Sequence, residues 1–147
     1  MRRAIAHRPA GSWPAAEQSG SVTLPHAERH RRRFSLTDDD GAAFLLDLAR
    51  PAAMADGDGL ELDGGGWLRV VAAPEELAEI TCEDPETLAR IAWHIGNRHM
   101  PVQVLRGGTL RLPADHVLIA MLQTLGAHVR RVTAPFQPEG GAYHGHE

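Results

Sequence analysis

The sequence predicts an α+β protein with two domains, a small all-β domain followed by a domain in which strands and helices alternate. Short apolar runs separated by Asp-Gly and Gly-Gly pairs fill residues 21–73, which is the pattern of strands joined by tight turns. Residues 74–133 instead contain two stretches whose apolar residues recur at helical spacing, each flanked by short strand-like runs. A chain of 147 residues has room for two small domains.

The first domain is expected to be a small β-sheet. Acidic and glycine-rich segments, such as residues 38–41 and 63–66, divide its apolar runs, and aspartate and glycine tolerate the backbone angles of tight turns. Ala73 and Pro74 interrupt the strand pattern and mark the domain boundary. The expected strands are residues 22–24, 31–36, 43–47, 60–62 and 67–71.

The second domain is expected to follow the order βαββαβ, which is the split βαβ pattern of ferredoxin-like domains. Its first helix begins after the N-cap Asp84, with a proline at the first helical position, and ends near Arg98. Its second helix begins after the N-cap Asp115 and is closed by Gly126. The apolar residues expected on one side of the second helix are Val117, Leu118, Met121, Leu122 and Leu125. The expected strands are residues 77–82, 102–105, 109–112 and 129–133.

Both ends of the chain are expected to lack regular structure. Residues 1–20 mix proline, glycine and serine with little periodicity, so we expect a disordered arm that cannot offset its ordering entropy. Residues 134–147 again contain proline and glycine, and they carry His144 and His146. This composition predicts a flexible, His-containing C-terminal tail.

Composition excludes several functions. The formal net charge of −4 argues against a general nucleic-acid binder, which needs a basic face to neutralise phosphates. All 15 basic residues are arginine, so lysine-based catalysis is excluded. The single cysteine, Cys82, cannot form an intramolecular disulfide or a thiolate cluster. The sequence offers no apolar stretch long enough for a secretion signal or a membrane span, and we expect a cytoplasmic protein.

Nine histidines make a metal site the main chemical question, because imidazole is a common ligand of borderline divalent metals. His94 and His99 are separated by about 140° on a helix, so they cannot chelate one ion together. We expect His94 to lie in the core, satisfied by a hydrogen bond, and His99 to project beyond the helix end. We expect four histidines to be structural or solvated: His7, which lies in the expected disordered arm, and His26, His30 and His128, which have no acidic or imidazole partner at useful spacing.

The surroundings of His99 resemble a known family. Residues 93–104 read Trp-His-Ile-Gly-Asn-Arg-His-Met-Pro-Val-Gln-Val. They are similar to the signature of the urease accessory protein UreE family, an aromatic residue and His-Leu-Gly-Asn-Arg-His followed by a proline and a glutamine. Residues 115–118 resemble the family's Asp-His-Val-Leu helix start, and residues 135–143 resemble the segment that leads to its His-bearing tail. The likeness covers about residues 21–147.

The resemblance implies a non-enzymatic nickel metallochaperone. Such a protein delivers Ni²⁺ to the urease apoprotein, together with urease accessory proteins that include the accessory GTPase. The resemblance also implies a homodimer in which His99 of both subunits binds one ion at the two-fold axis. His144 or His146 would then complete the coordination. His116 is the weakest candidate ligand, because Ala114 stands where some relatives have a further histidine.

Other interpretations remain open at this point. Ligands with nitrogen and oxygen donors also suit Zn²⁺ and Cu²⁺, so these ions can compete, and the chain can be a general nickel or zinc carrier. Alternatively, the β domain binds a partner protein or peptide while the histidines are incidental. A metal-dependent hydrolase is the weakest alternative, because no acidic residue is spaced to act as a general base beside three ligands.

Overall fold

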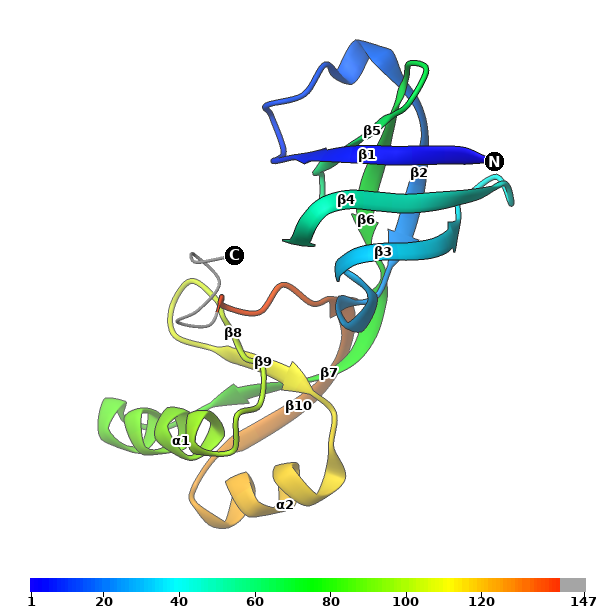
Figure 1. Ribbon diagram of the computed structural model, residues 1–147. Helices are drawn as coiled ribbons and strands as arrows, with labels where there is room; N and C mark the ends of the chain where they lie inside the picture. The colour runs from blue at the N-terminus through cyan, green and yellow to red at the C-terminus, as the bar shows by residue number, and fades with distance from the viewer. Residues whose placement is uncertain (141–147) are drawn as a thin grey trace. The chain divides into compact units, whose positions relative to one another are not determined.

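The computed structural model describes residues 1–140. Within them the chain divides into two compact units, Met1–Ala73 and Pro74–Gly140. The predicted α+β class and two-domain plan are confirmed, because the first unit is built from strands and the second combines strands with two α-helices (Figure 1). Among the described residues, no helix has both the length and the apolar character that crossing a membrane requires.

The strands of the first unit form one mixed sheet in the order β2-β6-β5-β1-β4-β3. β1 runs parallel to β4 and β2 runs parallel to β6, while the other neighbouring pairs are antiparallel. The predicted turns at residues 38–41 and 63–66 join β3 to β4 and β5 to β6. The strands are β1 (Arg2–Arg8), β2 (Gln18–Leu24), β3 (His30–Thr37), β4 (Ala43–Ala53), β5 (Gly59–Leu62) and β6 (Trp67–Ala72), with short 3₁₀ turns at Ala15–Glu17 and His26–Glu28.

The expectation of a disordered arm at residues 1–20 is wrong. β1 lies inside the sheet, between β5 and β4, and Ala4 is fully buried. Trp13 stacks on Trp67 with ring centroids 5.7 Å apart and donates its indole N–H to the Gly57 carbonyl at 3.0 Å. The segment is ordered by pairing with strands that are distant in sequence, and such contacts cannot be predicted from its local composition.

The second unit has the element order expected from the sequence. Its four strands form an antiparallel sheet in the order β10-β7-β9-β8. Apolar side chains of β7 and β9 pack with both helices in one core, so α1 and α2 cover the same face of the sheet (Figure 1). The elements are β7 (Pro74–Thr81), α1 (Pro85–Asn97), β8 (Gln103–Val104), β9 (Leu110–Pro113), α2 (His116–Thr124) and β10 (His128–Pro135).

The start of each helix follows the sequence, but the buried side of α2 differs from the expectation. The Asp84 side chain accepts a hydrogen bond from the Thr87 amide at 2.8 Å, as an N-cap residue does. In α2 the buried residues are Leu118, Ile119 and Leu122, while Val117 and Leu125 are exposed. The helix is apolar on nearly every side, so spacing alone could not decide which side faces the core.

The prediction of a flexible tail from residue 134 is wrong for the first residues of that range. β10 continues to Pro135, and the next residue, Phe136, is only 1% exposed. The Glu139 amide then donates to the Val102 carbonyl at 2.8 Å. Of the expected tail, residues 134–135 therefore belong to β10 and Glu139 is bound to Val102, while residues 141–147 lie outside the described part of the chain.

Candidate metal centre

His99 lies in the turn that ends α1. Arg98 is the C-cap residue, and His99 has φ = +57°, which is the left-handed region. The His99 amide donates to the Gly96 carbonyl at 3.0 Å, and the Met100 amide donates to the Ile95 carbonyl at 3.4 Å. These two bonds form a Schellman motif, in which glycine usually occupies the position of His99. Within residues 1–140, His99 is the only non-glycine residue at positive φ.

The end of α2 provides an internal comparison, because it has the same motif. Gly126 holds the position equivalent to His99, has φ = +102° and donates to the Gln123 carbonyl at 3.1 Å. The Ala127 amide donates to the Leu122 carbonyl at 3.0 Å. Left-handed geometry costs an L-residue roughly 1–2 kcal/mol, and histidine tolerates it better than most residues. α1 therefore ends with backbone strain that α2 avoids, and strain of this kind concentrates at functional sites.

The turn presents the His99 imidazole to solvent. His99 is exposed, whereas the next residue, Met100, packs against the hydrophobic core of the second unit. The C-terminal end of a helix carries a partial negative charge, equivalent to about half an elementary charge, which favours a nearby cation. An imidazole fixed at this point suits a divalent metal ion both as a ligand and electrostatically.

His94 is separated from His99 by the end of the helix and differs from the expected core histidine. It is half-buried, and its ring meets the Trp93 ring edge-on with centroids 5.0 Å apart. In the part of the chain that the structure describes, this ring contact takes the place of the hydrogen bond that we expected. His94 needs no hydrogen-bond partner within the protein, because a half-buried imidazole can hydrogen-bond to water instead.

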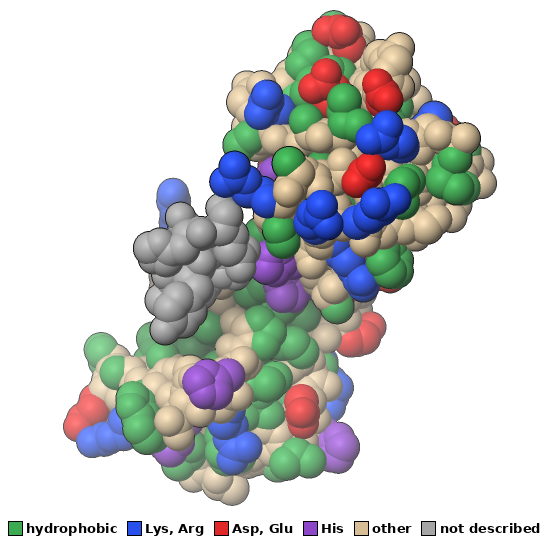
Figure 2. Space-filling view, viewed as in Figure 1, with side chains coloured by type: hydrophobic (Ala, Val, Ile, Leu, Met, Phe, Trp, Pro, Cys, Tyr) green, Lys and Arg blue, Asp and Glu red, His purple; other side chains and the backbone are tan. Residues whose placement is uncertain are grey.

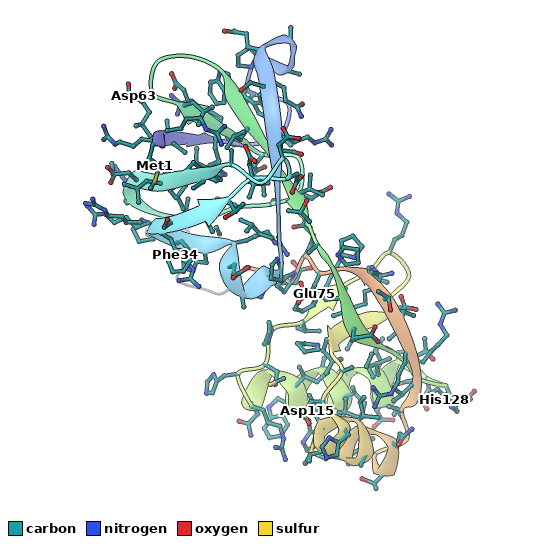
Figure 3. All side chains as sticks on the ribbon, turned by 90° about the vertical axis from the view of Figure 1, so that its right-hand side faces the viewer. Met1, Phe34, Asp63, Glu75, Asp115 and His128 are labelled. Carbon is teal, nitrogen blue, oxygen red and sulfur yellow. The ribbon has the colours of Figure 1, made fainter. Side chains whose placement is uncertain are left out.

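Asp115 and His116 begin α2, and Figure 3 labels Asp115 at this helix start. One carboxylate oxygen of Asp115, Oδ1, accepts hydrogen bonds from the Val117 amide at 2.9 Å and from the Leu118 amide at 3.1 Å. Asp115 therefore serves as the N-cap of α2. His116 is exposed at the first position of the helix.

Two histidines that were expected to be structural or solvated pair with carboxylates, although His7 was expected in a disordered arm and His128 without an acidic partner. The His7 ring nitrogen Nε2 lies 2.7 Å from Asp58 Oδ2, and His128 Nε2 lies 2.6 Å from Glu83 Oε1. Figure 3 labels His128 at the start of β10. Burial raises the pKa of Asp58, but hydrogen bonds from His7 and from two backbone amides outweigh it and hold that pKa below its ordinary value. Both partners are distant in sequence, so no local spacing could reveal them.

The described residues do not by themselves assemble a metal site with three or more protein ligands. Within residues 1–140, no group of three or more His, Cys, Asp or Glu side chains is placed to hold one ion. Figure 2 shows histidine side chains at several separate places on the face in view. Neither His99 nor His116 therefore belongs to a cluster of three potential ligands within that range, and the predicted ligands His144 and His146 lie outside it.

Gln103 has a long-range contact that the sequence did not predict. The Gln103 side chain accepts a hydrogen bond from the Gln137 amide at 3.0 Å, through its Oε1 atom. Gln103 follows His99 by four residues, within the segment that carries the family resemblance. Its place in that motif was the available signal, but the role depends on a partner 34 residues away.

These observations define a two-unit protein in which a β-sheet unit is joined to an α+β unit with an exposed histidine at a strained helix end. Residues 2–73 match the family described as "UreE urease accessory protein, N-terminal domain", and residues 75–147 match the corresponding C-terminal domain family. The chain therefore belongs to the urease accessory protein UreE family, which assists urease maturation.

Relatives in three bacteria illustrate the similarity. A urease accessory protein UreE of Beijerinckia indica is 48% identical over 147 residues, which is 99% of this chain and 83% of the relative. The protein of that name in Rhizobium rhizogenes is 44% identical over 99% of this chain and 86% of the relative. A third, in Bradyrhizobium sp. strain BTAi1, is 51% identical over 89% of this chain, but this chain spans only 63% of its length.

Proposed function

We propose that the chain is a nickel-binding metallochaperone that delivers Ni²⁺ to the urease apoprotein during assembly of the urease active site. Membership of an accessory family of urease supports this assignment. We further propose that it acts in the cytoplasm, without catalytic activity, together with other urease accessory proteins that include the accessory GTPase. The order βαββαβ and the sheet order β10-β7-β9-β8 support a ferredoxin-like assignment for the second unit.

The observation that carries the proposal is the left-handed conformation of His99. At the same position of α2 the chain uses Gly126, which meets the backbone requirement without strain. A histidine in this position weakens the helix end, so its imidazole must serve a purpose other than folding. Metal binding fits that purpose, because the side chain is exposed and lies at the negative end of a helix dipole.

One exposed imidazole cannot hold an ion tightly, and a homodimer meets this need. A two-fold axis brings the same residue of two subunits to one point, so that two copies of His99 share the ion. Exposed apolar side chains on the second unit support such an interface, because a second copy would remove them from water. These side chains are Trp93, Val104 and Val117, which are 64%, 50% and 62% exposed.

We propose that His144 and His146 supply further nitrogen ligands and that His116 contributes least. His116 ranks low because its neighbour Asp115, which could have been a second ligand, uses Oδ1 to accept two backbone amides as a helix cap. Sites with imidazole ligands accept Ni²⁺, Zn²⁺ and Cu²⁺, so the last two ions are expected to compete. The assignment of nickel rests on the family.

Isothermal titration of Ni²⁺ into the full chain tests the proposal. We expect a submicromolar site at one ion per dimer, its loss in His99→Ala, and its retention in the matched control His116→Ala. The nickel-loaded chain should then raise the activity of urease apoprotein in the presence of the accessory proteins, and the His99→Ala chain should not. A tight site that survives His99→Ala would overturn the assignment, and a monomer in sedimentation equilibrium would overturn the shared site.

A second candidate function is partner binding by the first unit, and a groove in its sheet favours it. β1 and β4 pair only through residues 2–4 and 44–46, and beyond this the strands diverge. The groove between them has a volume of about 530 Å³ and is lined by residues 5–8 and 48–53. Strand edges that face such a gap can accept an added extended segment, and the exposed Arg8 and Arg50 favour an acidic one.

A labelled decapeptide of alternating glutamate and valine tests this candidate by fluorescence anisotropy. The full chain should bind it more tightly than a peptide with lysine in place of glutamate. Arg8→Glu with Arg50→Glu should abolish the preference, whereas Arg90→Glu, on α1 of the other unit, should preserve it. Equal binding of both peptides by the unaltered chain would eliminate this candidate.

A further inference from the structure

β10 is an edge strand, and within residues 1–140 no other strand pairs with its outer side. In the order β10-β7-β9-β8 it has only β7 beside it, and the two strands pair through eight consecutive residues without a bulge. In Figure 3, β10 runs along the edge of the second unit, with His128 labelled at its start. Alternate residues of an edge strand direct their N–H and C=O groups outward, so this side of β10 can accept an added strand.

The opposite edge of the same sheet is covered by the chain itself. β8 contains only two residues. The Glu139 amide donates to the Val102 carbonyl at 2.8 Å, and the Glu139 carboxylate accepts from the Val104 amide at 3.4 Å. The short edge is thus protected, while the eight-residue edge stays open in the part of the chain that the structure describes. A long open edge strand is a common docking place for an extended segment of another protein.

The side chains of β10 place two arginines between two valines. The Arg130 side chain is 77% exposed and Arg131 is also exposed, whereas Val129 and Val132 are half-buried. Val129 packs against the core that contains both helices, so Val129 and Arg131 lie on the helix-covered face of the sheet. Arg130 and Val132 lie on the opposite face. An added strand would therefore meet the order apolar, basic, basic, apolar.

A row of charged side chains across the sheet ends on Arg130. Glu79 of β7 lies opposite Arg130 of β10 on one side and opposite Arg111 of β9 on the other. Arg130 Nη2 donates to Glu79 Oε1 at 2.6 Å, and Arg111 Nε donates to Glu79 Oε2 at 2.8 Å. These hydrogen bonds hold the pKa of Glu79 below its ordinary value, so the carboxylate stays ionised. The charges along the row alternate positive, negative, positive, and a negative side chain beyond β10 would continue the alternation.

We propose that the outer edge of β10 binds an extended segment of a partner protein in which two consecutive acidic residues are flanked by apolar ones. Side chains alternate along a strand, so one acidic residue lies beside Arg130 and the other beside Arg131 on the opposite face. The flanking apolar residues then lie beside Val129 and Val132. A second copy of this chain fits the edge less well, because antiparallel pairing of two β10 strands brings the arginines of both chains close together. The inference goes beyond the nickel function and does not depend on it.

Titration of the full chain with a peptide, followed by nuclear magnetic resonance, tests this edge. The probe is a decapeptide with Val-Glu-Glu-Val at its centre and serine and threonine on both sides. The matched control peptide has the same composition but Glu-Val-Val-Glu at its centre, which places valine beside each arginine. Each opposite-charge pair across two strands is worth about 1.4- to 5-fold in affinity, so the probe should bind roughly 2- to 25-fold more tightly than the control peptide. The amides of residues 128–135 should shift, and their hydrogen exchange should slow.

Variants of the two arginines provide a second arm of the test. Arg131→Gln and Arg130→Gln should each weaken binding of the probe by about 1.4- to 5-fold. Arg131→Gln leaves the bonds of Glu79 in place, so its effect is independent of that ion pair. Arg131→Lys keeps the charge and should retain most of the affinity. Arg90→Gln, on α1, is the matched control and should bind the probe as the native chain does.

Three results would overturn the proposal. The first is equal affinity of the native chain for both peptides, and the second is no saturation with the probe at millimolar concentration. The third is a set of amide shifts confined to residues 5–8 and 48–53, which would assign the probe to the groove of the first unit instead. A loss of Ni²⁺ binding in His99→Ala has no bearing on these measurements, so the two proposals can fail separately.

Discussion

Replacing His99 with glycine should stabilise the metal-free protein while removing the metal site. Relief of the left-handed conformation is worth roughly 1–2 kcal/mol. Glycine also makes the unfolded chain more flexible, which offsets about 0.5–1 kcal/mol of that gain. We therefore expect His99→Gly to raise the free energy of unfolding by about 0.5–1 kcal/mol. For a unit of this size, that gain corresponds to a rise of roughly 2–8 °C in Tm.

Differential scanning calorimetry with a chelator present measures this effect, since bound metal would add its own stabilisation. His99→Ala is the matched control, because alanine removes the imidazole but retains the strain at φ = +57°. Both variants should lose the Ni²⁺ site, and only the glycine variant should gain stability. The converse substitution, Gly126→His at the end of α2, should lower Tm.

The comparison of these variants can refute the reasoning directly. If His99→Gly melts no higher than His99→Ala, then the left-handed turn is not strained and the main argument for a functional His99 is lost. If both variants have the Tm of the native protein and still bind Ni²⁺, the assignment of His99 as a metal ligand is also wrong. Only a glycine-specific gain together with loss of binding in both variants supports the full argument.

Three further predictions concern groups outside the turn. Gly59→Ala should cost about 1–3 kcal/mol and shift tryptophan fluorescence, because its Cβ would lie 2.5 Å from the Trp13 ring; an unchanged emission maximum would count against this packing. The lowered pKa of Asp58 stabilises the folded state at neutral pH, and this stability should be lost as the pH falls below about 4. Asp58→Asn should lower the free energy of unfolding at pH 7 by about 1–3 kcal/mol, and that free energy should then fall less steeply as the pH is lowered. If it falls as steeply as in the native protein, Asp58 is not the cause. Asp115→Ala should cost about 1 kcal/mol in urea unfolding through loss of the helix cap, without changing Ni²⁺ affinity; a weakened metal site would show that Asp115 does more than cap α2.

Much of the second unit could be predicted from patterns of a few neighbouring residues. Asp84 and Asp115 were predicted to cap the two helices, and their side chains accept the expected amide hydrogen bonds. Caps depend on residues within three positions of each other, so the sequence contains both partners. The motif around His99 likewise identified the family and the end of α1 from contiguous residues.

The first twenty residues show the limit of that approach. β1 is short and polar at several positions, so its composition resembles a disordered segment. Its order comes from pairing with β4 and β5 on either side. The acidic partners of His7 and His128 were missed for the same reason, because they lie 51 and 45 residues away.

The sequence by itself therefore determined the family, the two-domain plan and the helix caps, and it made His99 the leading candidate ligand. Only the tertiary structure decided that β1 completes a sheet, that His99 is held in a left-handed turn, and that the Gln137 amide donates to Gln103. The physical reason is the range of the interactions. Caps and turns are fixed by neighbouring residues, whereas sheet pairing and the hydrogen bond between Gln137 and Gln103 form only when distant segments fold together.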